Sequence, residues 1–371
     1  MDEEKLYWIA LNMVYGIGAV RFRSLLAYFG DAKTAWNASE SNLRAAGLSE
    51  KIAQNLIQLR AAKDLGLIQS QLETLKVTVL TWEDAGYPRR LHEIDQPPPV
   101  LYVRGTFTEA DEWAVAIVGT RRVTTYGRQV TEQLATILAQ SGITIISGLA
   151  LGVDSIAHQA ALNAGGRTIS VLGSGVDRPS PSENQRLAER MMKQGAVISD
   201  YALGTPPDAA NFPPRNRIIS GLSMTVVVVE AGKQSGALIT AQFAVEQGRE
   251  VFAVPGSIFA PQSQGTNRLI QQGARPMLSP QEVLEALDLG RVAQHREARA
   301  IIPANDLETQ ILALIRNEAL HVDDISVQAQ LPINEVSATL AMMELKGMVR
   351  QMGGMNYQAL REERADYKTD A

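Results

Sequence analysis

The chain has 371 residues, 45% of them apolar, which is enough for two or three domains with sizeable cores. It has no cysteine, which excludes disulfides, thiolate metal sites and cysteine nucleophiles, and its net charge of −5 arises mainly in residues 306–371, with 11 acidic and 6 basic groups. Because it has neither an apolar leader nor a run near the ~18 residues of a membrane span, we expect a cytoplasmic protein without a membrane partner.

Residues 1–65 predict a helical domain. The segments VYGIGAVRFRSLLAYFG and AAGLSEKIAQNLIQLR each lead from a glycine turn into an amphipathic helix, as in paired helix-hairpin-helix or SAM-like units. In such a hairpin the Gly16-Ile17-Gly18 turn can offer N–H groups to a phosphate, with Arg21 and Arg23 adding charge. The alternative is a small helical bundle that uses its glycines only to turn the chain.

Residues 66–287 predict the main domain. Strands are expected at 77–80 and 100–103, separated by three prolines that force an extended crossing. From Ala114 onward, β-branched strands run into glycine-rich turns four times, in AVAIVGTRR, ITIISGLAL, TISVLGSGV and TVVVVEAGKQSG, and helices are expected near 125–140, 153–164, 183–193, 236–247 and 280–287. This alternation is typical of an α/β fold with a doubly wound, Rossmann-like parallel sheet.

Residues 288–305 are charged and lack periodicity, so we expect a linker. Residues 306–371 predict three helices and a glycine-tipped hairpin, the outline of a winged helix with a tail. The third helix carries Glu335 and Glu344 against Lys346, which favours packing or partner binding over the reading of duplex DNA.

The glycine turns predict an anion site. In a parallel sheet all four turns reach one edge, where glycines admit a ligand to the backbone and helix N-termini present N–H groups. The site residues expected from the turns are Gly119, Ser147, Gly148, Gly173, Ser174, Gly175 and Lys233.

Arginines and one aromatic residue add to this edge. Arg121 and Arg122 stand in the first turn, and the segment NFPPRNRIISG brings Phe212, Arg215, Asn216 and Arg217. Phosphates and an unstacked base suit this inventory best. The alternative for the arginines is internal ion pairing with Glu230 or Asp200.

The same turns fit poorly with cofactor binding or catalysis. No G-x-G-x-x-G follows the first strand and no P-loop is present, so no nucleotide cofactor is expected. Asp154 is expected to cap its helix with His158 packed beside it, and no third ligand at metal spacing accompanies them. Glu230 ends a central strand, where it is either a general base or a carboxylate that binds the N–H groups of the facing turn. We assign no catalytic residue and expect no enzyme.

The motifs between residues 80 and 280 resemble those of the DprA/Smf family. They are IVGTRRVTTYG, SGLALGVDSIAH, VLGSGVDRPSPSEN, FPPRNRIISGLS, VVVVEAGKQSGALITAQFAVEQGREVFAVPGS and GTNRLIQQGA, in this order. The resemblance implies an extended Rossmann sheet that binds and protects single-stranded DNA and loads the RecA recombinase onto it in natural transformation or recombination. It also implies a DNA pocket lined by Arg121 and by residues 212–217, and a homodimer through the sheet domain.

The chain departs from the family pattern at two turns. Ser180-Pro181-Ser182 replaces a common Tyr-Pro-Lys run, for whose lysine Arg178 or Arg186 could substitute, and Leu151 stands where many relatives have an arginine. We therefore expect somewhat weaker phosphate binding than is usual for the family.

Two further expectations concern assembly and an alternative function. The resemblance places the dimer contact near Leu269, Ile270 and Met277, an apolar strip after the last strand, and the alternative is that these residues pack into their own core. The alternative function is a nucleoside-monophosphate phosphoribohydrolase, whose related sheet would place Glu230 beside an N-glycosidic bond, although its Pro-Gly-Gly turn is missing here.

Overall fold

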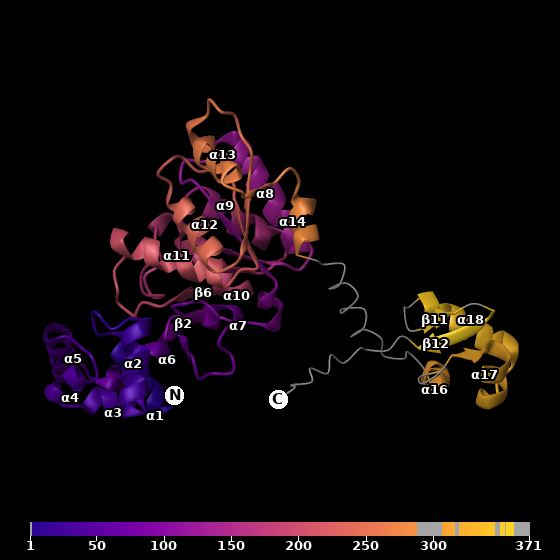
Figure 1. The fold of residues 1–371 in the computed structure, drawn as a ribbon, viewed down its shortest axis with the longest axis horizontal. Coiled ribbons are helices and arrows are strands. Elements are labelled where there is room, and N and C mark those ends of the chain that lie inside the picture. The colour runs from indigo at the N-terminus through magenta and orange to yellow at the C-terminus, as the bar shows by residue number, and fades with distance from the viewer. Residues whose placement is uncertain (1, 288–305, 316–318, 346–348, 353, 360–371) are drawn as a thin grey trace. The chain divides into compact units, whose positions relative to one another are not determined.

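The computed structural model describes residues 2–287, 306–315, 319–345, 349–352 and 354–359, which is the part of the chain coloured in Figure 1. Backbone contacts divide the chain into two compact units, with the boundary after Leu287. The predicted linker, 288–305, lies outside the described residues. Within the described residues, no helix is long and apolar enough to cross a membrane.

Six helices open the first unit, and the first five of them lie within residues 1–65, where the sequence predicts a helical domain. They are α1 (Glu3–Asn12), α2 (Ala19–Phe29), α3 (Ala32–Asn37), α4 (Glu40–Ala45), α5 (Glu50–Ala62) and α6 (Leu65–Thr74). Asp31 caps α3 by accepting the Thr34 N–H, and Ser39 caps α4 by accepting the Asn42 N–H. In Figure 1 these indigo helices gather at one end of the unit, next to β2 (Val100–Gly105).

The helices and the sheet share a core. Trp8 on α1 lies 4.8 Å from Phe22 on α2, ring centre to ring centre, and the same buried cluster contains Val79 and Tyr102 from the first two strands. Arg23 is placed over the Trp82 ring at 5.3 Å, and Arg21 donates to the carbonyl of Gly16 at 2.8 Å. Both arginines of the predicted phosphate turn therefore contact groups of their own chain.

Nine strands form one sheet in the order β1-β2-β6-β5-β4-β3-β7-β8-β9. All neighbouring strands between β6 and β9 in this order are parallel, while β2 is antiparallel to both β1 and β6. The bounds are β1 (Thr78–Thr81), β3 (Ala114–Val118), β4 (Thr144–Ser147), β5 (Thr168–Val171), β6 (Ala196–Ser199), β7 (Thr225–Val228), β8 (Glu250–Ala253) and β9 (Arg275–Pro276). The predicted doubly wound sheet is confirmed.

Helices cover both faces of this sheet. Val197 packs with Leu187 of α10, whereas its neighbour Ile198 packs with Ile218 of α11, and because successive strand residues point to opposite faces these helices lie on opposite sides. The helices are α7 (Arg89–His92), α8 (Thr125–Gln140), α9 (Val153–Asn163), α10 (Gln185–Gln194), α11 (Phe212–Gly221), α12 (Gly236–Glu246), α13 (Gln264–Gln271) and α14 (Pro280–Ala286).

The second unit is the small fold that the sequence predicts. It contains α16 (Asp306–Leu314), β10 (Leu320–His321), α17 (Val322–Ala329), α18 (Ile333–Leu345), β11 (Val349–Gln351) and β12 (Asn356–Ala359), with the strands in the order β10-β12-β11. Ile311, Ile325 and Leu340, one from each helix, are fully buried together. Three helices against a small antiparallel sheet make a winged helix.

Candidate nucleic-acid interface

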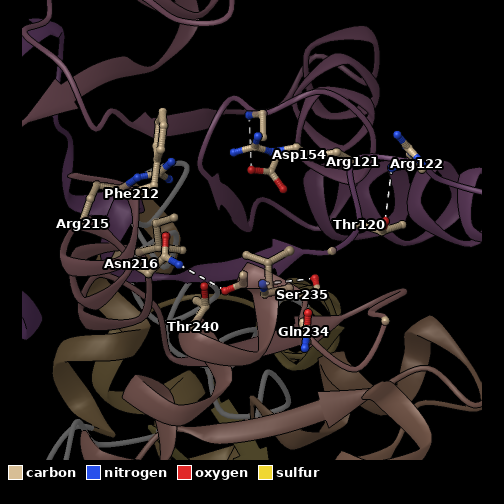
Figure 2. Close-up of a pocket in the computed structure, with 17 residues that line it drawn as sticks. Thr120, Arg121, Arg122, Asp154, Phe212, Arg215, Asn216, Gln234, Ser235 and Thr240 are labelled. Carbon is tan, nitrogen blue, oxygen red and sulfur yellow. Dashed lines mark hydrogen bonds between the residues drawn. The ribbon is translucent and has the colours of Figure 1, made fainter. Parts of the chain in front are cut away.

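A cavity of about 450 Å³ opens at the carboxyl edge of the sheet. It lies where the strand order reverses, because β3 has β4 on one side and β7 on the other, and such a switch point is where open α/β sheets bind ligands. Its walls come from the turn after β3, the turn after β4, α11 and the turn after β7 (Figure 2). The lining residues are Val118, Gly119, Thr120, Arg121, Arg122, Ala150, Asp154, Phe212, Arg215, Asn216, Ile219, Gly232, Gln234, Ser235, Gly236, Ala237 and Thr240.

Arg121 and Arg122 form the exposed rim of the cavity. The guanidinium of Arg121 lies 5.6 Å from the centre of the Phe212 ring, and Phe212 is only half-buried. Thr120 accepts the backbone N–H of Arg122 at 3.2 Å, which fixes the turn. Within the described part of the chain, neither guanidinium of the rim has an ion pair or hydrogen bond to a protein group, so their donors are free for a ligand.

Arg215 forms the floor of the cavity. It is only 4% exposed, and it donates to the Gly148 carbonyl at 3.2 Å. An ideal Cβ at Gly148 would lie 2.0 Å from the Nη1 of Arg215, so a larger residue there would displace the guanidinium from its present position. Burial lowers the pKa of Arg215 to about 10, which still leaves it charged at neutral pH.

Asp154 supplies a negative charge beside this arginine. The sequence predicts that Asp154 caps its own helix, and this prediction is wrong. Its carboxylate instead accepts the N–H groups of Gly148 at 3.1 Å and Ala150 at 3.3 Å. Burial raises the pKa of Asp154, and the attraction of Arg215 opposes that shift. The floor is therefore internally compensated, unlike the rim.

His158 lies deeper than the floor and is fully buried. Its Nδ1 shares a hydrogen bond of 2.6 Å with the Thr168 hydroxyl. Burial, with a smaller contribution from Arg215, lowers the pKa of His158 to about 3. The imidazole is therefore neutral, which agrees with the packing role expected for it.

The turn after β7 places a helix end at the cavity. Ser235 caps α12 by accepting the Ala237 N–H, and both residues line the cavity, so the positive end of the helix dipole faces it. Asn216 on α11 donates to the Gly236 carbonyl at 3.3 Å and ties the two walls together. Both features are suited to an anionic ligand.

Glu230 is held by the facing turn. It is 2% exposed, and its carboxylate accepts the backbone N–H of Thr124 at 2.9 Å and the hydroxyl of the same residue. Of the two roles left open by the sequence, the structure shows the carboxylate that binds the facing turn.

The other predicted site residues do not line the cavity. Ser147 and Ser174 are buried and donate to the carbonyls of Ile117 and Arg178, respectively. Arg217 pairs with Asp200 at 3.0 Å, which is the internal ion pair left open by the sequence. Gly173 and Gly175 are buried, with Gly173 against the Phe212 ring, and Lys233 is exposed outside the cavity.

Some cavity residues were missed by the sequence reasoning. Thr120, Gln234 and Ser235 are immediate neighbours of predicted residues, so extending each turn by one or two positions would have found them. Thr240 lies one helical turn after the β7 turn, and only the helix geometry brings it to the cavity. Ala150 lies in the turn after β4, and the sequence analysis assigns it no binding role.

The structure also locates the residues at which the chain departs from the family pattern. Leu151 is 41% exposed next to the cavity wall. Arg178 lies 3.9 Å from Asp177, and Arg186 lines a second cavity, of about 600 Å³, between α8, α9 and α10. In the apolar strip, Leu269 and Ile270 are half-buried, whereas Met277 is 5% exposed and packs within its own chain.

Comparisons with known proteins identify the class of this α/β protein. A family model described as DNA recombination-mediator protein A matches residues 78–288, and one for the DprA winged helix domain matches residues 295–355. Protein Smf of Synechocystis sp. is 35% identical over 394 residues, covering 96% of this chain and 99% of that protein. The DNA processing protein DprA of Bacillus subtilis is 46% identical over 202 residues, covering 54% of this chain and 68% of that protein.

Two solved structures share the fold. DNA processing protein A from Streptococcus pneumoniae aligns with a TM-score of 0.65 at 32% identity, covering 77% of this chain and 98% of that one. DNA processing protein A from Helicobacter pylori, solved to describe its single-stranded DNA binding mode, aligns with a TM-score of 0.52 at 32% identity, covering 57% and 96%. The chain belongs to the DprA/Smf family.

Proposed function

We propose that this chain binds single-stranded DNA in the cavity at the carboxyl edge of the sheet. The observation that carries the proposal is the rim, where two arginines without an ion pair or side-chain hydrogen bond among the described residues stand beside the half-buried ring of Phe212 and the start of α12. Arginines and helix N-termini bind phosphates of any sequence, and an aromatic ring stacks on any unpaired base. The Helicobacter pylori relative, which binds single-stranded DNA, lends support.

A salt titration with labelled oligo-dT tests this proposal. If about three phosphates are neutralised, the logarithm of affinity falls with the logarithm of salt concentration at a slope near −2, at roughly 0.7 per phosphate. Blunt duplex of the same length should bind less well, because its bases cannot reach the Phe212 ring. A flat salt response, or equal affinity for the duplex, would contradict the proposal.

The role that we propose is protection of the strand and its delivery to RecA in transformation or recombination. The match to a recombination-mediator family supports this role, and a protein that handles such strands beside RecA acts in the cytoplasm. The measurement is RecA filament growth on oligo-dT coated with a single-strand binding protein, with and without this chain. No acceleration would contradict RecA loading and leave strand binding intact.

We propose binding without catalysis. The carboxylate of Glu230, the base that a phosphoribohydrolase would need, already accepts two hydrogen bonds from Thr124. Incubation with AMP should release no adenine. Release that is lost in Glu230→Gln would establish the enzyme instead.

We also propose a homodimer through the sheet domain. Leu269 and Ile270 remain half-exposed, and Leu269 lines a cavity of about 660 Å³ at the β8–β9 edge. A charge at a two-fold contact faces its own copy, so Leu269→Glu should give a monomer that holds short strands but releases long ones. Light scattering measures the mass, and circular dichroism checks that the variant folds. A wild type that is monomeric with and without DNA would overturn the dimer.

A further inference from the structure

The loop between β8 and α13 carries an unusual apolar pair. Phe259 is 88% exposed, the highest value among the large apolar side chains of the described residues, and its neighbour Ile258 is 74% exposed. Exposing apolar surface of this size to water is unfavourable by about 25 cal/mol per Å². A cluster of this kind beside a binding cavity therefore indicates a contact that the free chain does not make.

The base of this loop is firmly held. The side chain of Asn267 both donates to the Gly256 carbonyl at 3.0 Å and accepts the Gly256 N–H at 3.2 Å. The Gln262 carbonyl accepts the Ala231 N–H, and the Gly265 N–H donates to the Ala231 carbonyl, both at 2.7 Å. Phe259 therefore projects from a loop whose base is fixed, so the backbone loses little conformational entropy when a ligand covers the side chain.

The base of the loop adjoins the proposed DNA cavity. Ala231 and Gly232 form the turn after β7, and Gly232 lines the cavity. An ideal Cβ on Gly232 would lie 3.6 Å from the carbonyl oxygen of Pro261, two residues after Phe259. On the other side, the exposed Tyr126 at the start of α8 donates its hydroxyl to the Pro255 carbonyl at 3.0 Å. The loop therefore borders the cavity beyond the β7 turn.

A long strand has to leave this cavity. A volume of about 450 Å³ lies in the range that holds a small-molecule ligand, so most of a long strand stays outside. Residues 255–267 contain no charged side chain, so this segment offers a phosphate no ionic partner. What it does offer is an aromatic face, which suits an unstacked base.

We infer that Phe259, supported by Ile258, is a second stacking platform, for a base of the single strand that leaves the cavity on the β8 side. The inference rests on the proposed binding of single-stranded DNA and extends it to a separate subsite. Two neighbouring side chains present far less area than the ~800 Å² per partner of a stable protein interface. The segment also lacks the basic residues that attract a lipid surface.

The test compares Phe259→Ala with Phe259→Trp on two lengths of labelled oligo-dT. We take as short the smallest oligo-dT whose affinity Arg121→Ala weakens, and as long one of about three times that length. Phe259→Ala should leave the short strand unaffected and weaken the long strand roughly fivefold or more, the size of one lost base stack. Phe259→Trp should restore the affinity, because indole stacks at least as well.

Leu67→Ala is the matched control, since Leu67 is an exposed apolar residue (64%) on α6. It should change neither affinity. A second readout is tryptophan fluorescence of Phe259→Trp, with the wild type as the blank, which should fall when the long strand is added and not when the short one is.

Each result decides between the proposals. A wild type that binds neither strand overturns the proposed function. A wild type that binds both, with Phe259→Ala equal to it on the long strand and no fluorescence change in Phe259→Trp, overturns the stacking platform alone. A weakened long-strand affinity that is accompanied by a lower mass by light scattering would assign the loop to self-association and likewise overturn the stacking platform.

Discussion

The rim and the floor of the cavity use the same residue type for different purposes. Among the described residues, Arg121 and Arg122 on the rim are exposed and have no ion pair or side-chain hydrogen bond, whereas Arg215 on the floor is 4% exposed, hydrogen-bonded to Gly148 and compensated by Asp154. A buried charge that is compensated supports the fold, and an exposed one is free to bind. Substitutions at the floor should therefore reduce stability, and those at the rim should reduce binding.

The largest effect is expected from Arg215→Ala. Its loss removes the buried hydrogen bond to Gly148 and the positive charge that favours the carboxylate of Asp154, which together should cost about 3 kcal/mol or more. Urea unfolding followed by circular dichroism should show this loss. Arg122→Ala is the comparison from the rim and should lie within about 0.5 kcal/mol of the wild type. Equal stability of both variants would abolish the distinction between floor and rim.

The next largest effect is expected from Arg121→Ala, which should weaken the binding of single-stranded DNA. The loss of a charge-assisted hydrogen bond to phosphate costs about 1–3 kcal/mol, or roughly 5- to 150-fold in affinity for oligo-dT. Fluorescence anisotropy at fixed salt measures it. The control is Arg89→Ala on α7, whose side chain is 85% exposed and forms a surface ion pair with Glu93, the residue after the helix. If both variants bind like the wild type, the rim is not the DNA contact.

Arg217 sharpens the comparison, because the sequence groups it with Arg215 as a DNA contact. Its ion pair with Asp200 has side chains only 16% and 15% exposed, so we expect Arg217→Ala to lower stability by about 1–2 kcal/mol. Affinity for oligo-dT, measured where the variant is fully folded, should stay within about twofold. A larger loss of affinity would return Arg217 to the DNA site.

Near neutral pH the smallest effect is the one due to His158, because it develops only as the pH falls. Its pKa of about 3 in the folded chain lies below the ~6.5 of an unfolded chain, so the unfolded state binds more protons between these values. Stability should fall as pH falls through this interval, by at most about 1.4 kcal/mol per pH unit. The raised pKa of Asp154 acts in the opposite direction, so wild type and His158→Gln are compared. Parallel stability curves would show that His158 does not titrate as inferred.

Local sequence signals predict the frame of the site better than its chemistry. The helices expected at 125–140 and 153–164 are α8 and α9 to within a residue, because glycine turns and amphipathic periodicity are local signals. The difference between Arg121 and Arg215 depends instead on a contact with Gly148, 67 residues away from Arg215. The same limit explains Ser147, whose hydroxyl is engaged by the neighbouring strand, and Met277, whose burial depends on packing around β9.

The core shared by the N-terminal helices and the first two strands has a consequence for cooperativity. Trp8 and Phe22 pack in the same buried cluster as Val79 and Tyr102, so neither part can open without exposing the other to water. We expect residues 1–287 to melt in a single calorimetric transition, in which the calorimetric and van't Hoff enthalpies agree. A chain shortened to begin at β1 would leave the Tyr102 side of the sheet uncovered, and should aggregate on warming before it reaches the melting temperature of the intact protein.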